Sequence, residues 1–138
     1  MYEKFGQFIN GEWCQSSDKS TYEVINPANE EVIGHASKAT NQDVERALKS
    51  AEKGLQIWKK TPPWQRSYII RRIADKIREK QDILAKWMTL EVGKPLTEAK
   101  GEVNGAADIF EWNAEETKRI YGQTVESRFE DTRVHVYY

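Results

Sequence analysis

Two charged side chains, Glu91 and Lys94, stand where the sequence predicts the end of a helix. Gly93 supplies the permissive backbone that ends a helix, and Pro95 is tolerated as the first residue of the next helix, where an N–H has no partner. A carboxylate at a helix C-terminus meets the negative end of the helix dipole, which is unfavourable unless a cation compensates it. The positive partner of Glu91 is either Lys94 or another cation, unless Glu91 is simply an exposed acid in water.

Few other residues have the type and spacing for chemistry. Cys14 follows a predicted turn with no cation, base or helix N-terminus in view, so we interpret it as an ordinary surface or packing cysteine. A single cysteine excludes an internal disulfide, and His35 and His135 lack the spacing of metal ligands. Gly101 and Gly105 lie inside a predicted helix rather than in the strand-to-helix turn of a phosphate-binding motif. We therefore expect no phosphate binding by this chain alone.

The charge pattern is that of solvated helix faces. The 138 residues are 31% charged with a net charge of −1, and no long run of one sign attracts nucleic acid or an acidic membrane. No apolar run approaches the roughly 20 residues that cross a bilayer, and residues 1–4 lack the pattern of a signal peptide. We expect a cytoplasmic protein without nucleic-acid or membrane partners.

Short strands are predicted at both ends of the chain. The Asn10-Gly11 pair lies between apolar residues, which is the signature of a hairpin turn. Two extended segments, 22–25 and 31–33, flank a turn at 26–29. Residues 133–138 alternate polar and apolar side chains like a half-exposed strand, whose edge normally pairs, is covered or aggregates.

A capping box opens the first predicted helix. Thr40 and Asp43 have the spacing at which each side chain satisfies a free N–H at a helix start. Apolar residues then recur at helical spacing on one stripe, which consists of Val44, Leu48, Ala51, Leu55 and Trp58. Pro62 and Pro63 end this helix and begin the next.

The second helical stretch covers residues 64–92. Polar residues at 79–82 interrupt its apolar stripe and predict a break near Lys80, with Asp82 placed to cap the second half. Large aromatic side chains here and in the flanking helices stand beside aliphatic neighbours, which favours core packing over base or cofactor stacking for Trp58, Trp64, Trp87, Phe110 and Trp112.

The helix after Pro95 is predicted to be the longest and to stop at Gly122. Its apolar stripe consists of Ala99, Val103, Ala106, Phe110, Ala114 and Thr117. Gly101 and Gly105 each weaken this helix by about 1 kcal/mol relative to alanine. Either another backbone passes close to them or they are surface glycines.

These motifs together resemble the NAD(P)-dependent aldehyde dehydrogenase superfamily, and more narrowly its succinate-semialdehyde dehydrogenase branch. Each segment alone is a weak signal, but their order and spacing are specific; they are residues 8–13, 25–28, 64–67, 90–103 and 110–116. The resemblance implies an α/β fold. This chain would supply a helix-rich fragment with short N-terminal strands, three to four helices and a C-terminal oligomerisation strand.

The resemblance also implies two parts. Residues 1–122 would be the N-terminal part of the cofactor-binding domain, and 123–138 the first strand of the sheet through which subunits form a dimer or tetramer. The partner would be the remainder of the parent polypeptide, which holds the catalytic cysteine and glutamate and the NAD or NADP site. The parent would oxidise an aldehyde such as succinate semialdehyde to a carboxylic acid. The fragment alone is expected to bind neither NAD nor NADP and to be inactive.

Two sets of site residues follow from the resemblance. A structural Na⁺ or K⁺ would lie near the Glu91 carboxylate and the backbone carbonyls of Val24 and Ile25. One wall of the substrate entrance would consist of Glu102, Ala106 and Phe110. No catalytic or cofactor-binding residue is assigned. A different hypothesis is a helical interaction module that self-associates through its exposed edge strand.

Overall fold

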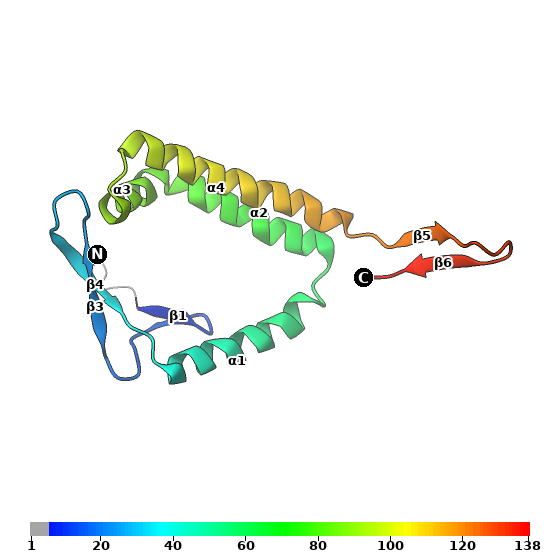
Figure 1. Ribbon diagram of the computed structural model, residues 1–138, viewed down its shortest axis with the longest axis horizontal. Coiled ribbons are helices and arrows are strands. Elements are labelled where there is room, and N and C mark those ends of the chain that lie inside the picture. The colour runs from blue at the N-terminus through cyan, green and yellow to red at the C-terminus, as the bar shows by residue number, and fades with distance from the viewer. Residues whose placement is uncertain (1–5) are drawn as a thin grey trace.

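A computed structural model describes residues 6–138 (Figure 1). The described helices are α1 (Asn41–Trp58), α2 (Pro63–Glu79), α3 (Gln81–Val92) and α4 (Leu96–Glu116), followed by the 3₁₀ turn η2 (Thr117–Arg119). The described strands are β1 (Gln7–Ile9), β2 (Glu12–Cys14), β3 (Thr21–Ile25), β4 (Val32–Ser37), β5 (Gln123–Glu126) and β6 (Arg133–Val136). The expected helix-rich fragment with short strands is confirmed, while the expectation about residues 1–4 lies outside the described part.

The strands form three antiparallel pairs: β1–β2, β3–β4 and β5–β6. Asn10 and Gly11 connect β1 to β2 with φ values of 57° and 84°, as the hairpin turn predicted from their sequence requires. The strand predicted at 133–138 is present as β6, but it pairs with β5, which the sequence did not predict. All four β5 residues are exposed, so β5 lacks the apolar alternation that reveals a strand.

Helices α2 and α4 lie side by side, and α1 runs apart from them (Figure 1). The β3–β4 pair lies at one end, near α3, and the β5–β6 hairpin projects from the other end. None of the helices in residues 6–138 has the length and apolar character to cross a membrane.

Small side chains form the core between the helices. Among residues 6–138 the buried apolar residues are Ala74, Ala85, Ala99, Val103, Ala107 and Ala114. Ile77, Leu84 and Met88 pack against Ala85, Ala99 and Val103. The predicted α4 stripe was wrong in its middle, because Ala107 is fully buried while Phe110 is 38% exposed. Alanines allow helices to approach closely, and hydrophobicity alone does not decide which of two adjacent alanines faces a neighbour.

Ion pairs along one flank fix the antiparallel register of α2 and α4. Arg78 contacts Asp108 at 2.8 Å and Glu111 at 2.7 Å, and Arg71 bridges Glu111 and Glu115. These hydrogen bonds raise the pKa of Arg78 above its ordinary value. Because the groups share partners, the network orients the helices more firmly than isolated surface pairs would.

Helix boundaries agree with the sequence except at three positions. The break near Lys80 is confirmed, but Asp82 makes no capping hydrogen bond and instead pairs with Lys100 on α4 at 2.7 Å. Pro95 is the N-cap of α4 rather than its first helical residue. Gly122 does not end α4, which stops at Glu116; a Cβ at Gly122 would overlap the carbonyl oxygen of Val136 in the β5–β6 hairpin.

Several predicted core side chains are exposed. On α1 the apolar stripe is open, with Leu48 60% and Leu55 56% exposed. Trp64 and Trp112 are 75% and 70% exposed, so their assignment to the core was wrong for this chain; Lys118 lies over the Trp64 ring at 5.0 Å. A Cβ built at Gly101 or Gly105 meets nothing within 4 Å, so no described backbone passes close to them. These faces have no covering element in residues 6–138.

Candidate functional site

The helix junction at Gly93 lies against the turn between β3 and β4. Gly93 adopts a left-handed conformation with φ 76°, and its N–H donates to the Thr89 carbonyl at 2.9 Å. A Cβ at Gly93 would stand 2.9 Å from Cγ of Pro27. A side chain there would meet both backbone strain and the proline ring, so glycine permits this contact. The structure thereby brings together two loops 66 positions apart in the sequence.

Local hydrogen bonds shape the β3–β4 turn. The Asn26 N–H donates to the Glu31 carbonyl at 2.9 Å, and the Asn26 side-chain oxygen accepts from the Ala28 N–H at 3.0 Å. The register shifts just before the turn: Val24 lies opposite Gly34, and Ile25 opposite Val32. One residue of β4 is therefore extra, and such a bulge disrupts the ladder of backbone hydrogen bonds. The irregularity lies at the two residues whose carbonyls the resemblance assigns to a cation.

The charged residues of the junction divide between two helices. Glu91 is exposed near the end of α3, and Lys94 forms an ion pair with Glu102 on α4. Lys94 is the more buried member of that pair, with a side chain 21% exposed. Lys94, the candidate partner of Glu91 in the sequence, therefore connects the junction to α4 through Glu102.

The three predicted entrance residues lie on one side of α4. Glu102, Ala106 and Phe110 follow at intervals of four residues, which places them on one helix face. Their stripe is next to the buried one that contains Val103 and Ala107. The face offers one carboxylate and one aromatic ring.

The remaining candidate groups are dispersed. Cys14 Sγ lies 3.5 Å from the Gln7 carbonyl oxygen and 3.7 Å from Nη2 of Arg46, so the expectation that no cation stands near this thiol was wrong. His135 Nδ1 lies 3.1 Å from Thr124 Oγ1 across the β5–β6 hairpin. Within residues 6–138 no three His, Cys, Asp or Glu side chains form a metal-binding group.

Comparison with known proteins places this arrangement in a family. The model of the aldehyde dehydrogenase family matches residues 13–138. The chain belongs to the aldehyde dehydrogenase family. Glutarate-semialdehyde dehydrogenase of Pseudomonas putida is 45% identical over 129 residues, which are 94% of this chain and 27% of that protein. Succinate-semialdehyde dehydrogenase [NADP(+)] of Escherichia coli is 41% identical over 93% of this chain and 27% of its own length.

Solved structures of other proteins have the same fold over this region. A betaine aldehyde dehydrogenase of Staphylococcus aureus, in complex with NAD⁺, is 35% identical and superposes with a TM-score of 0.85 over 93% of this chain and 26% of its own. An NADP-dependent enzyme of Escherichia coli is 40% identical with a TM-score of 0.88. The chain spans about a quarter of the length of these relatives.

The described part of this aldehyde dehydrogenase chain does not fit a dinucleotide. NAD(P)-binding folds place the pyrophosphate at the helix N-terminus that follows a strand of a parallel sheet. Every sheet in residues 6–138 consists of two antiparallel strands. Residues 6–138 therefore contain no parallel-sheet site of this kind for the pyrophosphate.

Sequence reasoning missed the most buried polar cluster of the chain. Asp43 is 1% exposed, and its Oδ2 accepts hydrogen bonds from the Thr40 N–H at 3.0 Å and the Ser17 N–H at 3.1 Å. The Thr40 N–H, with a further contribution from Ser17, holds the pKa of Asp43 well below its ordinary value. Ser16 Oγ lies 3.3 Å from the same oxygen, and the Ser16 N–H donates to Ser37 Oγ at 2.9 Å. The capping box revealed the contact with Thr40, but no sequence signal pointed to Ser16 and Ser17.

Proposed function

We propose that this chain is part of an NAD(P)-dependent aldehyde dehydrogenase that acts in the cytoplasm and oxidises a semialdehyde, such as succinate or glutarate semialdehyde, to the carboxylic acid. The observation that carries the proposal is the 41–45% identity to two semialdehyde dehydrogenases over more than nine-tenths of the chain. We assign no catalytic or cofactor-binding residue within the chain. Its contribution is structural, and the chain alone is inactive.

The two-part division fits this role. Residues 1–122 would form the N-terminal part of the cofactor-binding domain, and 123–138 would join the oligomerisation sheet of a dimer or tetramer. The projection of the β5–β6 hairpin away from the helices supports this, because it leaves strand edges accessible to another sheet (Figure 1). On α4, Glu102, Ala106 and Phe110 would form one wall of the substrate entrance.

A chimeric enzyme tests the proposed function. The segment of the Pseudomonas putida enzyme that matches this chain is replaced by the chain itself. Oxidation of glutarate semialdehyde is expected to stay within about tenfold of the parent enzyme, because the reacting groups are untouched and a tenfold change is only about 1.4 kcal/mol of barrier. The 138-residue chain alone is expected to give no aldehyde-dependent NAD(P)H. A folded chimera without activity, or NAD(P)H formation by the chain alone, would contradict the proposal.

We further propose a Na⁺ or K⁺ site formed by the Glu91 carboxylate with the backbone carbonyls of Val24 and Ile25. The contact between Gly93 and Pro27 supports it, because each loop residue lies two positions after its candidate ligand. The register shift between Val24 and Ile25 adds support, because it interrupts the regular β3–β4 ladder next to the two candidate carbonyls. A cation there would compensate the carboxylate at the helix C-terminus.

Salt-specific thermal stabilisation tests the cation site. KCl or NaCl at about ten times Kd is expected to raise Tm by about 4 °C relative to choline chloride at the same ionic strength, because a ligand that binds only the folded state stabilises it. Glu91→Gln removes this difference, whereas Glu98→Gln, an exposed carboxylate in the first turn of α4, preserves it. Equal Tm values in all three salts for the unmodified chain would refute the site.

A further inference from the structure

The folded chain exposes far more surface than its mass requires. Its accessible surface is 10823 Å² for 16.1 kDa, whereas a compact monomer of that mass exposes about 7,400 Å². The excess is about 3,400 Å². Its fully buried apolar side chains are mostly alanine, while large apolar side chains lie outside. A large surface of this chain is therefore shaped for contact with another protein segment.

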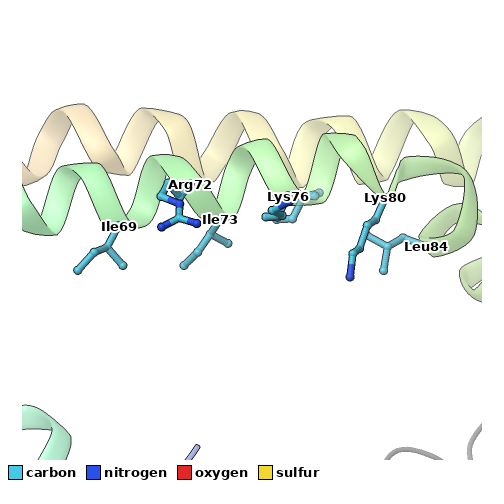
Figure 2. Close-up of a pocket in the computed structure, with 7 residues that line it drawn as sticks. Ile69, Arg72, Ile73, Lys76, Lys80 and Leu84 are labelled. Atoms are coloured by element: carbon cyan, nitrogen blue, oxygen red, sulfur yellow. The ribbon is translucent and has the colours of Figure 1, made fainter.

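One part of this surface is a groove along α2 and the start of α3. We call it the α2–α3 groove; it is lined by Ile69, Arg72, Ile73, Lys76, Ile77, Lys80 and Leu84. Figure 2 shows Ile69 and Ile73 on the side of α2 turned away from α4, with Leu84 of α3 at the far end of the groove. Its isoleucines Ile69 and Ile73 are 39% and 41% exposed. In Figure 1 this side of α2 faces toward α1.

The charges of the groove have one sign. Arg72, Lys76 and Lys80 follow at intervals of four residues beside the isoleucines, and no acidic residue lines the groove. Lys76 pairs with Glu79 outside the lining, and Arg72 lies over the Tyr68 ring at 5.9 Å. The complementary surface is therefore an apolar ridge with carboxylates along its edge.

The size of the exposed surface indicates what covers the α2–α3 groove: a second copy of the chain or the rest of a longer polypeptide. A standard interface between separate proteins buries about 800 Å² of each partner, roughly a quarter of the excess here, so a second copy with such an interface leaves most of it uncovered. The relatives match 94% of this chain while the matched segment is only 27% of their length, so the same segment occurs within a much larger polypeptide. Burying an excess surface of this size requires contacts as extensive as those inside one domain.

We propose that the α2–α3 groove is a docking surface for the part of an aldehyde dehydrogenase polypeptide that lies outside this chain, and that it binds this part even when the two are separate chains. The inference rests on the proposed function and adds the surface, its residues and assembly in trans. Docking buries Ile69, Ile73 and Leu84, and places carboxylates of the incoming chain beside Lys76 and Lys80.

Co-expression tests the docking surface. The tagged 138-residue chain is produced with the Pseudomonas putida glutarate-semialdehyde dehydrogenase from which the matching segment has been removed. The two are expected to co-purify in equal amounts. Ile73→Asp is expected to weaken the complex at least about tenfold, because it places a charge in a contact that excludes water. Ile57→Asp is the matched control, since Ile57 is 72% exposed on α1, outside the groove and on the side opposite the apolar stripe.

The covalent chimera gives a second measurement that does not depend on the solubility of the truncated relative. There, Ile73→Asp is expected to lower Tm by several degrees more than Ile57→Asp. Equal effects of the two substitutions in both measurements would overturn the proposal. A homodimer of the chain that Ile73→Asp dissociates, without binding of the truncated relative, would assign the groove to a second copy and also overturn it. A complex without activity would contradict the proposed function and leave the docking surface intact.

Discussion

Asp43→Ala is expected to lower the Tm of the chain by about 10 °C, more than any substitution of an exposed charge. Asp43 is 1% exposed and accepts hydrogen bonds from the backbone N–H groups of Thr40 and Ser17. Alanine would remove the acceptor that the two N–H groups share, and because both hydrogen bonds are partly shielded from water, solvent replaces that acceptor only in part. The substitution also removes half of the capping box at the start of α1.

The effect of Asp43 reaches beyond its helix. Its carboxylate joins α1 to the loop between β2 and β3 through Ser17, and Ser16 of that loop is bonded to Ser37 at the end of β4. Loss of the carboxylate therefore loosens two hairpins from α1 at once. The nearby carboxyl of Asp18, which accepts hydrogen bonds from Ser20 and Ser16, has its pKa lowered to about 2, so this loop gathers two stabilised carboxylates.

The stabilisation of the fold by the Asp43 carboxylate depends on pH. Because hydrogen bonds lower its folded pKa below the ordinary value of 3.8, the carboxylate stabilises the fold fully above pH 3.8, and this contribution is lost as the pH falls toward the folded pKa. Asp43→Asn should flatten the stability profile below pH 4. Glu45→Ala, an exposed carboxylate on the same helix, should leave both Tm and the acid profile unchanged. An Asp43→Ala variant with unchanged Tm would show that the cluster contributes nothing to the fold.

Signals that act within a few residues predicted the structure well. The Asn10-Gly11 turn, the capping box at Thr40 and the end of α3 at Gly93 each depend on backbone conformations that the local residues impose. The two loops of the candidate cation site were likewise recognisable from sequence. Their proximity followed only from the family resemblance, because nothing in either loop alone specifies the contact between Pro27 and Gly93.

Long-range burial was predicted less well for a physical reason. A helix stripe shows which residues can be buried, but the neighbouring element decides which are. Trp64, Trp112 and the α1 stripe satisfy the periodicity of core residues and are exposed, since residues 6–138 supply no element to cover them. The family comparison is consistent with this: the chain spans about a quarter of the length of its relatives, and the rest of such a polypeptide is our proposed covering.

Ala107→Leu is expected to destabilise the chain by about 3 kcal/mol, the largest effect expected for a single core side chain. Ala107 is fully buried on the face of α4 that packs toward α2, and the buried face of α2 is equally small at Ser67 and Ala74. Three additional carbons would push the helices apart and pull Arg78 away from Asp108 and Glu111.

Urea unfolding monitored by circular dichroism measures the cost of Ala107→Leu, and Ala51→Leu on the exposed stripe of α1 is the control for helix propensity and hydrophobicity. The control should change stability by less than about 0.5 kcal/mol. If Ala107→Leu lowered the free energy of unfolding as little as Ala51→Leu, α2 and α4 would be able to move apart without a loss of stability. The alanine core and the shared ion pairs would then not determine the helix spacing, and the groove on the opposite side of α2 would not be held in a fixed shape for its partner.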